Sequence, residues 1–74
     1  MNIREKIQER LNGLQGLMER QDHLRFPELV TRNLEQVTKF WSALDENERE
    51  FLSAIRIATT EQISWNMRKL NSTH

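Results

Sequence analysis

Apolar residues recur along the chain at the three- and four-residue intervals of an α-helix, in three separate stretches. The first stretch predicts a helix over residues 3–22. Its apolar residues follow at spacings of four, three and four: Ile7, Leu11, Leu14 and Met18. Asn2 precedes them and Glu5 follows Asn2 by three residues, which is the pattern of a capping box at the start of a helix. The apolar arc is narrow, so we expect this helix to depend on its neighbours for stability.

The second stretch predicts a helix over residues 27–44, with the most regular pattern in the chain. Its apolar residues follow at spacings of four, three, four and three: Val30, Leu34, Val37, Trp41 and Leu44. Pro27 suits the first turn of this helix, and it disfavours helical geometry at Phe26. The sequence therefore places a break between the first two helices at residues 23–27.

The third stretch predicts a helix over residues 46–70. Asp45 and Glu48 form a second capping box at its start. Acidic residues crowd the first turns, and Arg68 and Lys69 lie in the last turn, which suits both ends of the helix dipole. Thr59 and its neighbour Thr60 are β-branched, so they mark the point where a kink would form.

These elements predict an all-α protein with one domain over residues 1–70 and a frayed polar tail over residues 71–74. Short connections favour antiparallel neighbours, so the simplest architecture is an up-down-up bundle of three helices. The alternative is a hairpin followed by a long C-terminal helix. In both architectures the third helix is longer than the second, at about 37 Å against about 27 Å. Its end would therefore extend beyond the bundle.

The third helix carries more apolar surface than two neighbours can cover, since its apolar residues span an arc of roughly 220°. We therefore expect a homo-oligomer, most simply a symmetric dimer, that also binds another protein. Exposed aromatic residues and methionines are frequent anchors of such contacts. The residues that we predict to contact a second copy or a partner are Phe40, Trp41, Ile57, Trp65, Met67 and Leu70. For Trp41 the pattern favours a core position over a contact position, because this residue continues the stripe of the second helix.

Composition narrows the function classes. The 74 residues include eleven Lys or Arg and eleven Asp or Glu, so the formal net charge is zero, and there is no Cys. Absence of Cys excludes a disulfide framework and a thiolate zinc site. No signal-peptide pattern opens the sequence and no apolar run approaches the length of a membrane span. We therefore expect a soluble, cytoplasmic protein.

Residue patterns that carry chemistry are sparse, and we expect neither an enzyme, nor a cofactor, nor a metal site. Glu19, Asp22 and His23 fit one face of a helix, but no Glu precedes a His by three residues as in di-iron bundles. Gly13 and Gly16 lie within a helical pattern, unlike the glycines of a phosphate-binding loop. The serines lie in helical segments without a recognisable triad.

Nucleic-acid binding is the alternative function. Residues 43–52 resemble the opening of the helix-turn-helix region of sigma-like factors, and residues 59–64 then correspond to the entry of a second helix. Arg4, Lys6 and Arg10 lie close enough to form a local basic patch. Against this alternative, positive charges are dispersed and no segment is strongly basic. The sequence favours a small protein-interaction module.

Overall fold

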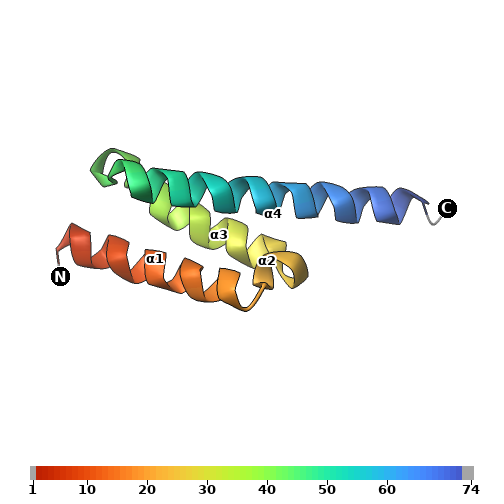
Figure 1. Cartoon of the computed structure of the whole chain (residues 1–74), viewed down its shortest axis with the longest axis horizontal. Coiled ribbons are helices and arrows are strands. Elements are labelled where there is room, and N and C mark those ends of the chain that lie inside the picture. The colour runs from red at the N-terminus through yellow and green to blue at the C-terminus, as the bar shows by residue number, and fades with distance from the viewer. Residues whose placement is uncertain (1, 73–74) are drawn as a thin grey trace.

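The computed structural model describes residues 2–72 and contains only helices and their connections within that range. Three main helices, α1 (Ile3–Glu19), α3 (Pro27–Thr38) and α4 (Glu46–Ser72), run in alternating directions (Figure 1). Two short elements lie in the connections, α2 (Asp22–Arg25) and the 3₁₀ turn η1 (Trp41–Ala43). This arrangement confirms the predicted all-α fold and its up-down-up order.

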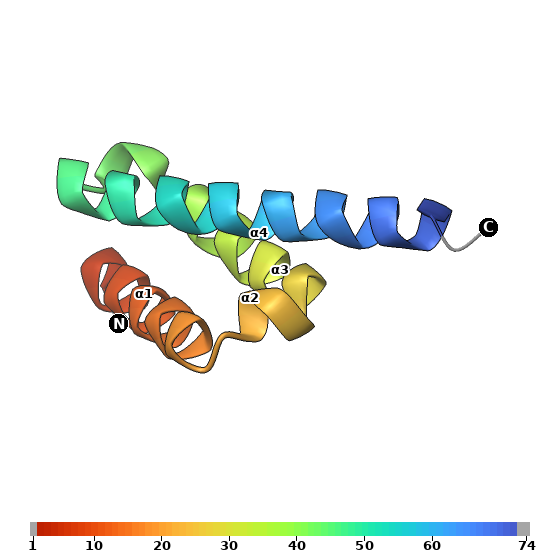
Figure 2. The same ribbon diagram turned by 45° about the vertical axis from the view of Figure 1, so that its right-hand side comes forward.

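The core lies where the apolar stripes of the three main helices meet. Figure 2 shows α1 and α4 on different sides of α3, so that α3 has a neighbour on each side. The buried apolar side chains come from all three helices and from Leu44, two residues before α4: Ile7, Leu11, Leu14, Leu17, Val30, Leu34, Val37, Leu44, Leu52 and Ile55. The periodic pattern thus identified most of the core of α1 and α3. It omitted Leu17, which is buried, and it included Met18, which is half-buried, and Trp41, which is exposed.

Both predicted capping sites are present. The Asn2 side chain accepts a hydrogen bond of 2.9 Å from the backbone N–H of Glu5. Asp45 accepts from the backbone N–H of Glu48 at 2.8 Å, and the Glu48 carboxylate accepts from the backbone N–H of Asp45 at 2.9 Å. Each bond satisfies an N–H that the first turn of a helix leaves without a backbone acceptor. Both helices therefore begin where the sequence placed them.

The first helix is shorter than predicted, because it ends at Glu19 rather than at residue 22. Gln21 adopts the left-handed conformation with φ of 58°, and its N–H donates to the Met18 carbonyl at 3.0 Å. This conformation turns the chain into α2, and Gly or Asn is its usual sequence signal. Gln carries no such signal, so the periodic pattern alone extended the helix by three residues.

The second helix is also shorter than predicted, because it ends at Thr38 rather than at residue 44. The chain then tightens into η1, where the Ala43 N–H donates to the Phe40 carbonyl at 2.8 Å. Leu44 remains buried because the turn returns it to the core. A pattern of apolar spacings records which side chains face inward, and it does not distinguish an α-helix from a 3₁₀ turn that keeps the same face inward.

The third helix continues without interruption from Glu46 to Ser72, through the threonines at which a kink was conceivable. Thr59 is almost fully buried against the body, so packing supports the helix at this point. Residues 71–72 are helical, contrary to the predicted tail over residues 71–74, and residues 73–74 lie outside the described range. α4 gives the molecule its elongated shape of 50 × 20 × 16 Å. Across residues 2–72, no helix has the length and apolar character that crossing a bilayer requires.

Candidate interaction surface

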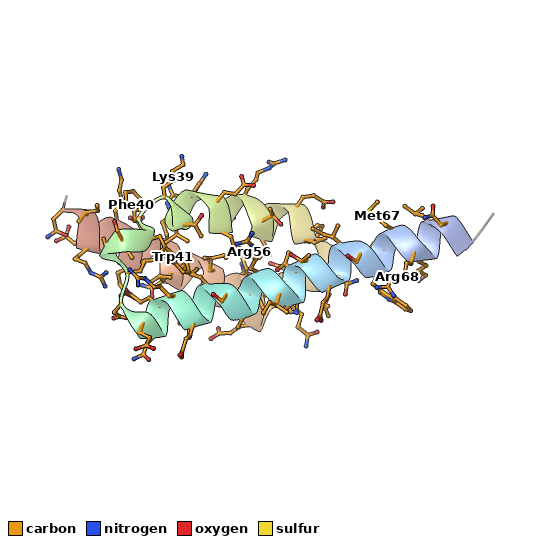
Figure 3. All side chains as sticks on the ribbon, turned by 90° about the horizontal axis from the view of Figure 1, so that it is seen from above. Lys39, Phe40, Trp41, Arg56, Met67 and Arg68 are labelled. Atoms are coloured by element: carbon orange, nitrogen blue, oxygen red, sulfur yellow. The ribbon has the colours of Figure 1, made fainter. Side chains whose placement is uncertain are left out.

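The last turns of α4 extend beyond the other helices, as Figures 1 and 3 show. Every residue from Ser64 to Asn71 is exposed, whereas α4 has buried side chains at Leu52, Ile55 and Thr59. We call residues 64–72 the overhang. Its apolar side chains are strongly exposed: Trp65 is 59 % exposed, Met67 61 % and Leu70 67 %. An exposed cluster of this kind marks a binding surface more often than isolated apolar residues do.

These apolar residues do not share one face of α4. With about 100° between successive residues, Met67 and Leu70 fall on the side of the helix that Ile63 begins, adjoining the buried stripe. Trp65 points outward, and Ile57, which is 61 % exposed, lies roughly 80° from it. Met67 and Leu70 thus share one face of α4, Trp65 lies on the outward face, and Ile57 lies between them, about 80° from both Met67 and Trp65.

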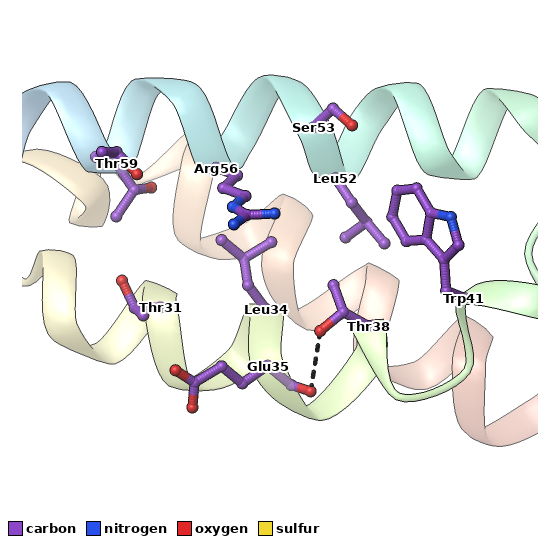
Figure 4. A pocket seen from close by; sticks show the side chains of 10 residues that line it. Thr31, Leu34, Glu35, Thr38, Trp41, Leu52, Ser53, Arg56 and Thr59 are labelled. Atoms are coloured by element: carbon purple, nitrogen blue, oxygen red, sulfur yellow. Dashed lines mark hydrogen bonds between the residues drawn. The ribbon is translucent and has the colours of Figure 1, made fainter.

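A groove of about 430 Å³ lies between α3 and α4, and we call it the α3–α4 groove (Figure 4). Leu34 and Leu52 contribute apolar surface, and the other lining side chains are mainly polar. Its lining residues come from both helices and from η1: Thr31, Leu34, Glu35, Thr38, Trp41, Leu52, Ser53, Arg56, Thr59 and Thr60. Arg56 and Trp41 project into the space between the two helices in this view. The groove has the mixed lining of a site that receives an amphipathic segment.

Trp41 lies at the η1 end of the groove and is 41 % exposed, so the structure places it at a surface rather than in the core. Arg49 holds it in place. The Arg49 guanidinium lies 5.6 Å from the centroid of the indole and donates to the Trp41 carbonyl from Nε at 3.1 Å and from Nη2 at 2.9 Å. Phe40, the neighbouring predicted contact residue, is half-buried and packs against the core.

The other end of the groove contains a buried hydroxyl with no hydrogen-bond partner. Thr59 is 1 % exposed, and its Oγ1 neither donates nor accepts a hydrogen bond. The groove hydroxyls of α3 differ, because Thr31 donates to the Pro27 carbonyl at 2.9 Å and Thr38 donates to the Glu35 carbonyl at 3.2 Å. A buried polar group without a hydrogen-bond partner destabilises the chain that contains it. The single chain therefore leaves one hydrogen-bonding group unsatisfied at this end of the groove.

Sequence reasoning missed a third apolar surface at the corner between α2 and α3. Leu24, Phe26 and Leu29 are all about half exposed there. All three are apolar residues outside the regular spacings that identified the core, and this was the signal that the sequence offered. The sequence pattern does not show that the turn places them at one corner. We call these three residues the α2–α3 corner.

Asp22, one of the three residues considered as metal ligands, pairs with two arginines instead. The buried carboxylate of Asp22 accepts from Arg20 Nε at 3.2 Å and lies 3.4 Å from Arg25 Nη2. These contacts balance its charge at the turn between α1 and α2. Over residues 2–72, no three His, Cys, Asp or Glu residues lie close enough together to hold a metal ion.

Arg4, one of the three residues of the basic patch considered for nucleic-acid binding, forms an ion pair with Glu48 that joins the start of α1 to the start of α4. Arg4 donates to both carboxylate oxygens of Glu48, from Nη1 at 3.1 Å and from Nη2 at 2.7 Å, and also to the Ala43 carbonyl at 3.0 Å. The hydrogen bond from Arg4 and the backbone hydrogen bond at Asp45 lower the pKa of Glu48. The same pairing raises the pKa of Arg4.

This pair gives a pH-dependent prediction. Because the pKa of Glu48 is lower in the folded chain than in the unfolded chain, the pair stabilises the fold above its ordinary value near 4.5 and loses its effect as pH falls through the lowered value. Arg4→Met should therefore lower the melting temperature at pH 7, with the difference from the native chain shrinking as the pH approaches 2. Thermal melts followed by circular dichroism measure this difference. Arg10→Met, which removes an exposed arginine from the same helix, is the control, and a difference for Arg4→Met that is independent of pH contradicts the prediction.

Most of the region that resembled a helix-turn-helix, residues 46–52 and 59–64, lies within one continuous helix. Residues 59–64 form the middle of α4, so the turn that the motif requires between its two helices does not occur there. Comparison with protein-family models, with curated proteins and with solved structures finds no match for this chain.

Proposed function

We propose that this protein is a non-enzymatic interaction module that works as a homodimer and presents a second surface to another protein. The observation that carries the proposal is the overhang. α4 continues in helical form through residues 64–72, beyond the other helices, and it exposes Met67 and Leu70 there. Isolated helical segments of this length are unstable in water, so a helix of this kind favours a covered state.

The surface area supports association. A compact monomer of 8.9 kDa is expected to expose about 4,800 Å². This chain exposes 5611 Å², about 800 Å² more, because α4 extends beyond the body. A typical specific interface buries about 800 Å² on each partner. The excess thus equals the area that one dimer contact removes.

The outward face of α4 supports the second role. Trp65 remains exposed on a face that points away from the α3–α4 groove, whereas Ile57 is exposed at the rim of that groove, beside Ser53, Arg56 and Thr60. Trp65 is suited to anchor a protein partner, since large apolar side chains dominate the energetics of such contacts. The module would then bind its partner in two copies, which strengthens binding to a partner with repeated sites.

Sedimentation of the unmodified chain tests the dimer. At low micromolar concentration we expect a species of twice the 8.9 kDa chain mass that dissociates on dilution. Sedimentation equilibrium at several loading concentrations gives the dissociation constant directly. A single 8.9 kDa species across the whole concentration range would overturn the proposal.

A further inference from the structure

The overhang and the α3–α4 groove match in length. Along α4 the groove extends from Leu52 to Thr60, which is eight residue steps or about 12 Å. The overhang extends from residue 64 to residue 72, again eight steps and about 12 Å. One overhang therefore fills the length of one groove.

The groove wall and the apolar residues of the overhang also share one face of α4. Leu52, Arg56 and Thr60 line the groove. Continuing at spacings of three, four and three, Ile63, Met67 and Leu70 follow on the same side of the helix. Figure 3 shows Arg56 between α3 and α4, with Met67 further along α4. The first half of this face is a groove wall, and the second half is an apolar stripe on which Met67 and Leu70 are exposed.

A face with a groove in one half and a stripe in the other is complementary to itself when two copies run antiparallel. A two-fold axis beside residues 61–62 places Met67 of the second copy opposite Arg56, and Ile63 of the second copy opposite Thr60. The symmetry repeats the contact, so both grooves are filled by both overhangs at once. The two bodies then lie end to end and do not overlap.

We infer that the α3–α4 groove is the docking site for the overhang of a second copy of this chain, with the two α4 helices antiparallel. The inference rests on the proposed dimer and specifies how its two copies meet. Each overhang becomes the fourth helix of the other copy's bundle, between α3 and α4. Met67 and Leu70 cover the apolar lining of the groove, and the end of the overhang approaches Trp41.

Charge favours the antiparallel direction. Arg68 and Lys69 lie at the C-terminal end of α4, whereas Glu46, Glu48 and Glu50 lie at its start. In the antiparallel pair the helix dipoles oppose, and the acidic starts of the two helices lie at opposite ends of the contact. A parallel pair would bring the acidic ends together, and like charges across an interface are unfavourable.

The α2–α3 corner adds apolar surface near the axis. α3 runs antiparallel to α4, with Thr31 and Thr60 lining the same groove, so the start of α3 lies at the end of the body nearest the overhang (Figure 1). Leu24, Phe26 and Leu29 are exposed at that end. In the docked pair the corners of both copies approach each other across the axis. This explains why a single chain leaves three large apolar residues uncovered there.

Paired cysteines test the docking, because the native chain contains none. Arg56 and Met67 are eleven residues apart on one helix, a separation of about 16 Å, which exceeds the roughly 7 Å that a disulfide spans. In Arg56→Cys/Met67→Cys a disulfide can therefore form only between copies. Under mild oxidation we expect most of this variant to run as a covalent dimer on a denaturing gel. Ala54→Cys/Arg68→Cys, on the outward face of α4 and within one residue of the same antiparallel register, is the matched control and should remain monomeric.

The outcomes separate this inference from the proposed dimer. Cross-linking of the control pair but not of the Arg56 and Met67 pair, in a chain that sediments as a dimer, would overturn the groove docking and leave self-association in place. A monomeric native chain with neither pair cross-linked would overturn both. Thr60→Arg provides a second measurement, since it places a bulky charge in the groove from an exposed position. It should weaken dimerisation at least tenfold, whereas Ala54→Arg should leave the dissociation constant unchanged.

Discussion

Replacing Leu14 by alanine is expected to remove most of the stability of the fold. Leu14 is 0 % exposed and belongs to the core that joins α1 to the other helices. Deleting a buried leucine to alanine costs about 2–5 kcal/mol, because apolar burial is lost and a cavity remains. A domain of this length has a total stability of about 4–11 kcal/mol. A single change therefore removes between a fifth of the stability and all of it.

We expect the loss of stability in Leu14→Ala to lie in the upper part of this range, because Leu14 holds α1 against the other helices. α1 presents a narrow apolar face, and it includes Gly13 and Gly16, which each reduce helix stability by up to ~1 kcal/mol relative to Ala. The helix has little stability of its own, so it cannot compensate for the lost contact. Urea denaturation followed by circular dichroism measures the loss. Ile57→Ala, at an exposed position, should change stability by less than about 0.5 kcal/mol.

Equal losses in Leu14→Ala and Ile57→Ala would contradict the assignment of the core. The comparison is informative because both changes remove a branched aliphatic side chain from a helix, and only the burial of that side chain differs. Retention of full helicity at low urea concentration by Leu14→Ala, with an unchanged midpoint, would likewise show that α1 does not depend on its packing.

The second large effect is expected on self-association. Met67→Gln/Leu70→Gln should weaken the dimer at least about 1,000-fold, because the symmetric contact contains both side chains twice and each buries most of its exposed apolar surface on docking, at about 1–2 kcal/mol per residue. At a concentration where both chains are monomeric, the variant and the native chain should have equal helicity, because both residues are exposed within the single chain and glutamine is a good helix former. Sedimentation equilibrium measures the dissociation constant, and circular dichroism of the same samples reports helicity.

Trp65→Gln is the control, since it removes an exposed aromatic residue from the outward face of the same helix. We expect it to leave the dimer intact and to reduce binding of another protein. If this variant dissociates the dimer and Met67→Gln/Leu70→Gln does not, the outward face is the site of self-association, and Trp65 rather than Met67 is its anchor. An unchanged dimer in both variants would contradict a role for α4 in assembly.

Local sequence determined most of the fold because its signals are periodic and short in range. The spacing of apolar residues predicted three helices and most of the core of α1 and α3. The Asp45 and Glu48 capping box fixed the start of α4, since both of its hydrogen bonds form within four residues. The ends of α1 and α3 were wrong because they depend on backbone conformation, namely the left-handed Gln21 and the 3₁₀ turn at Trp41, which apolar spacing does not record.

The candidate interaction surface was only partly predictable. Sequence reasoning named Met67, Leu70, Ile57 and Trp65 from the width of the apolar arc on α4, and all four are exposed. It could not show that α3 and α4 leave a groove between them that Trp41 borders, or that Leu24, Phe26 and Leu29 are all exposed at the α2–α3 corner. These features depend on where separate helices end relative to one another.

The sequence alone determined that the chain is helical, which faces are apolar, and that the third helix exceeds its partners in length and apolar surface, because each of these is a property of one segment. Only the tertiary structure decided which apolar residues of α4 are covered. Leu52 and Ile55 pack against the other helices, and Met67 and Leu70 lie beyond them. The physical reason is that burial depends on the distance to a neighbouring helix, and that distance is set by the turns that end α1 and α3.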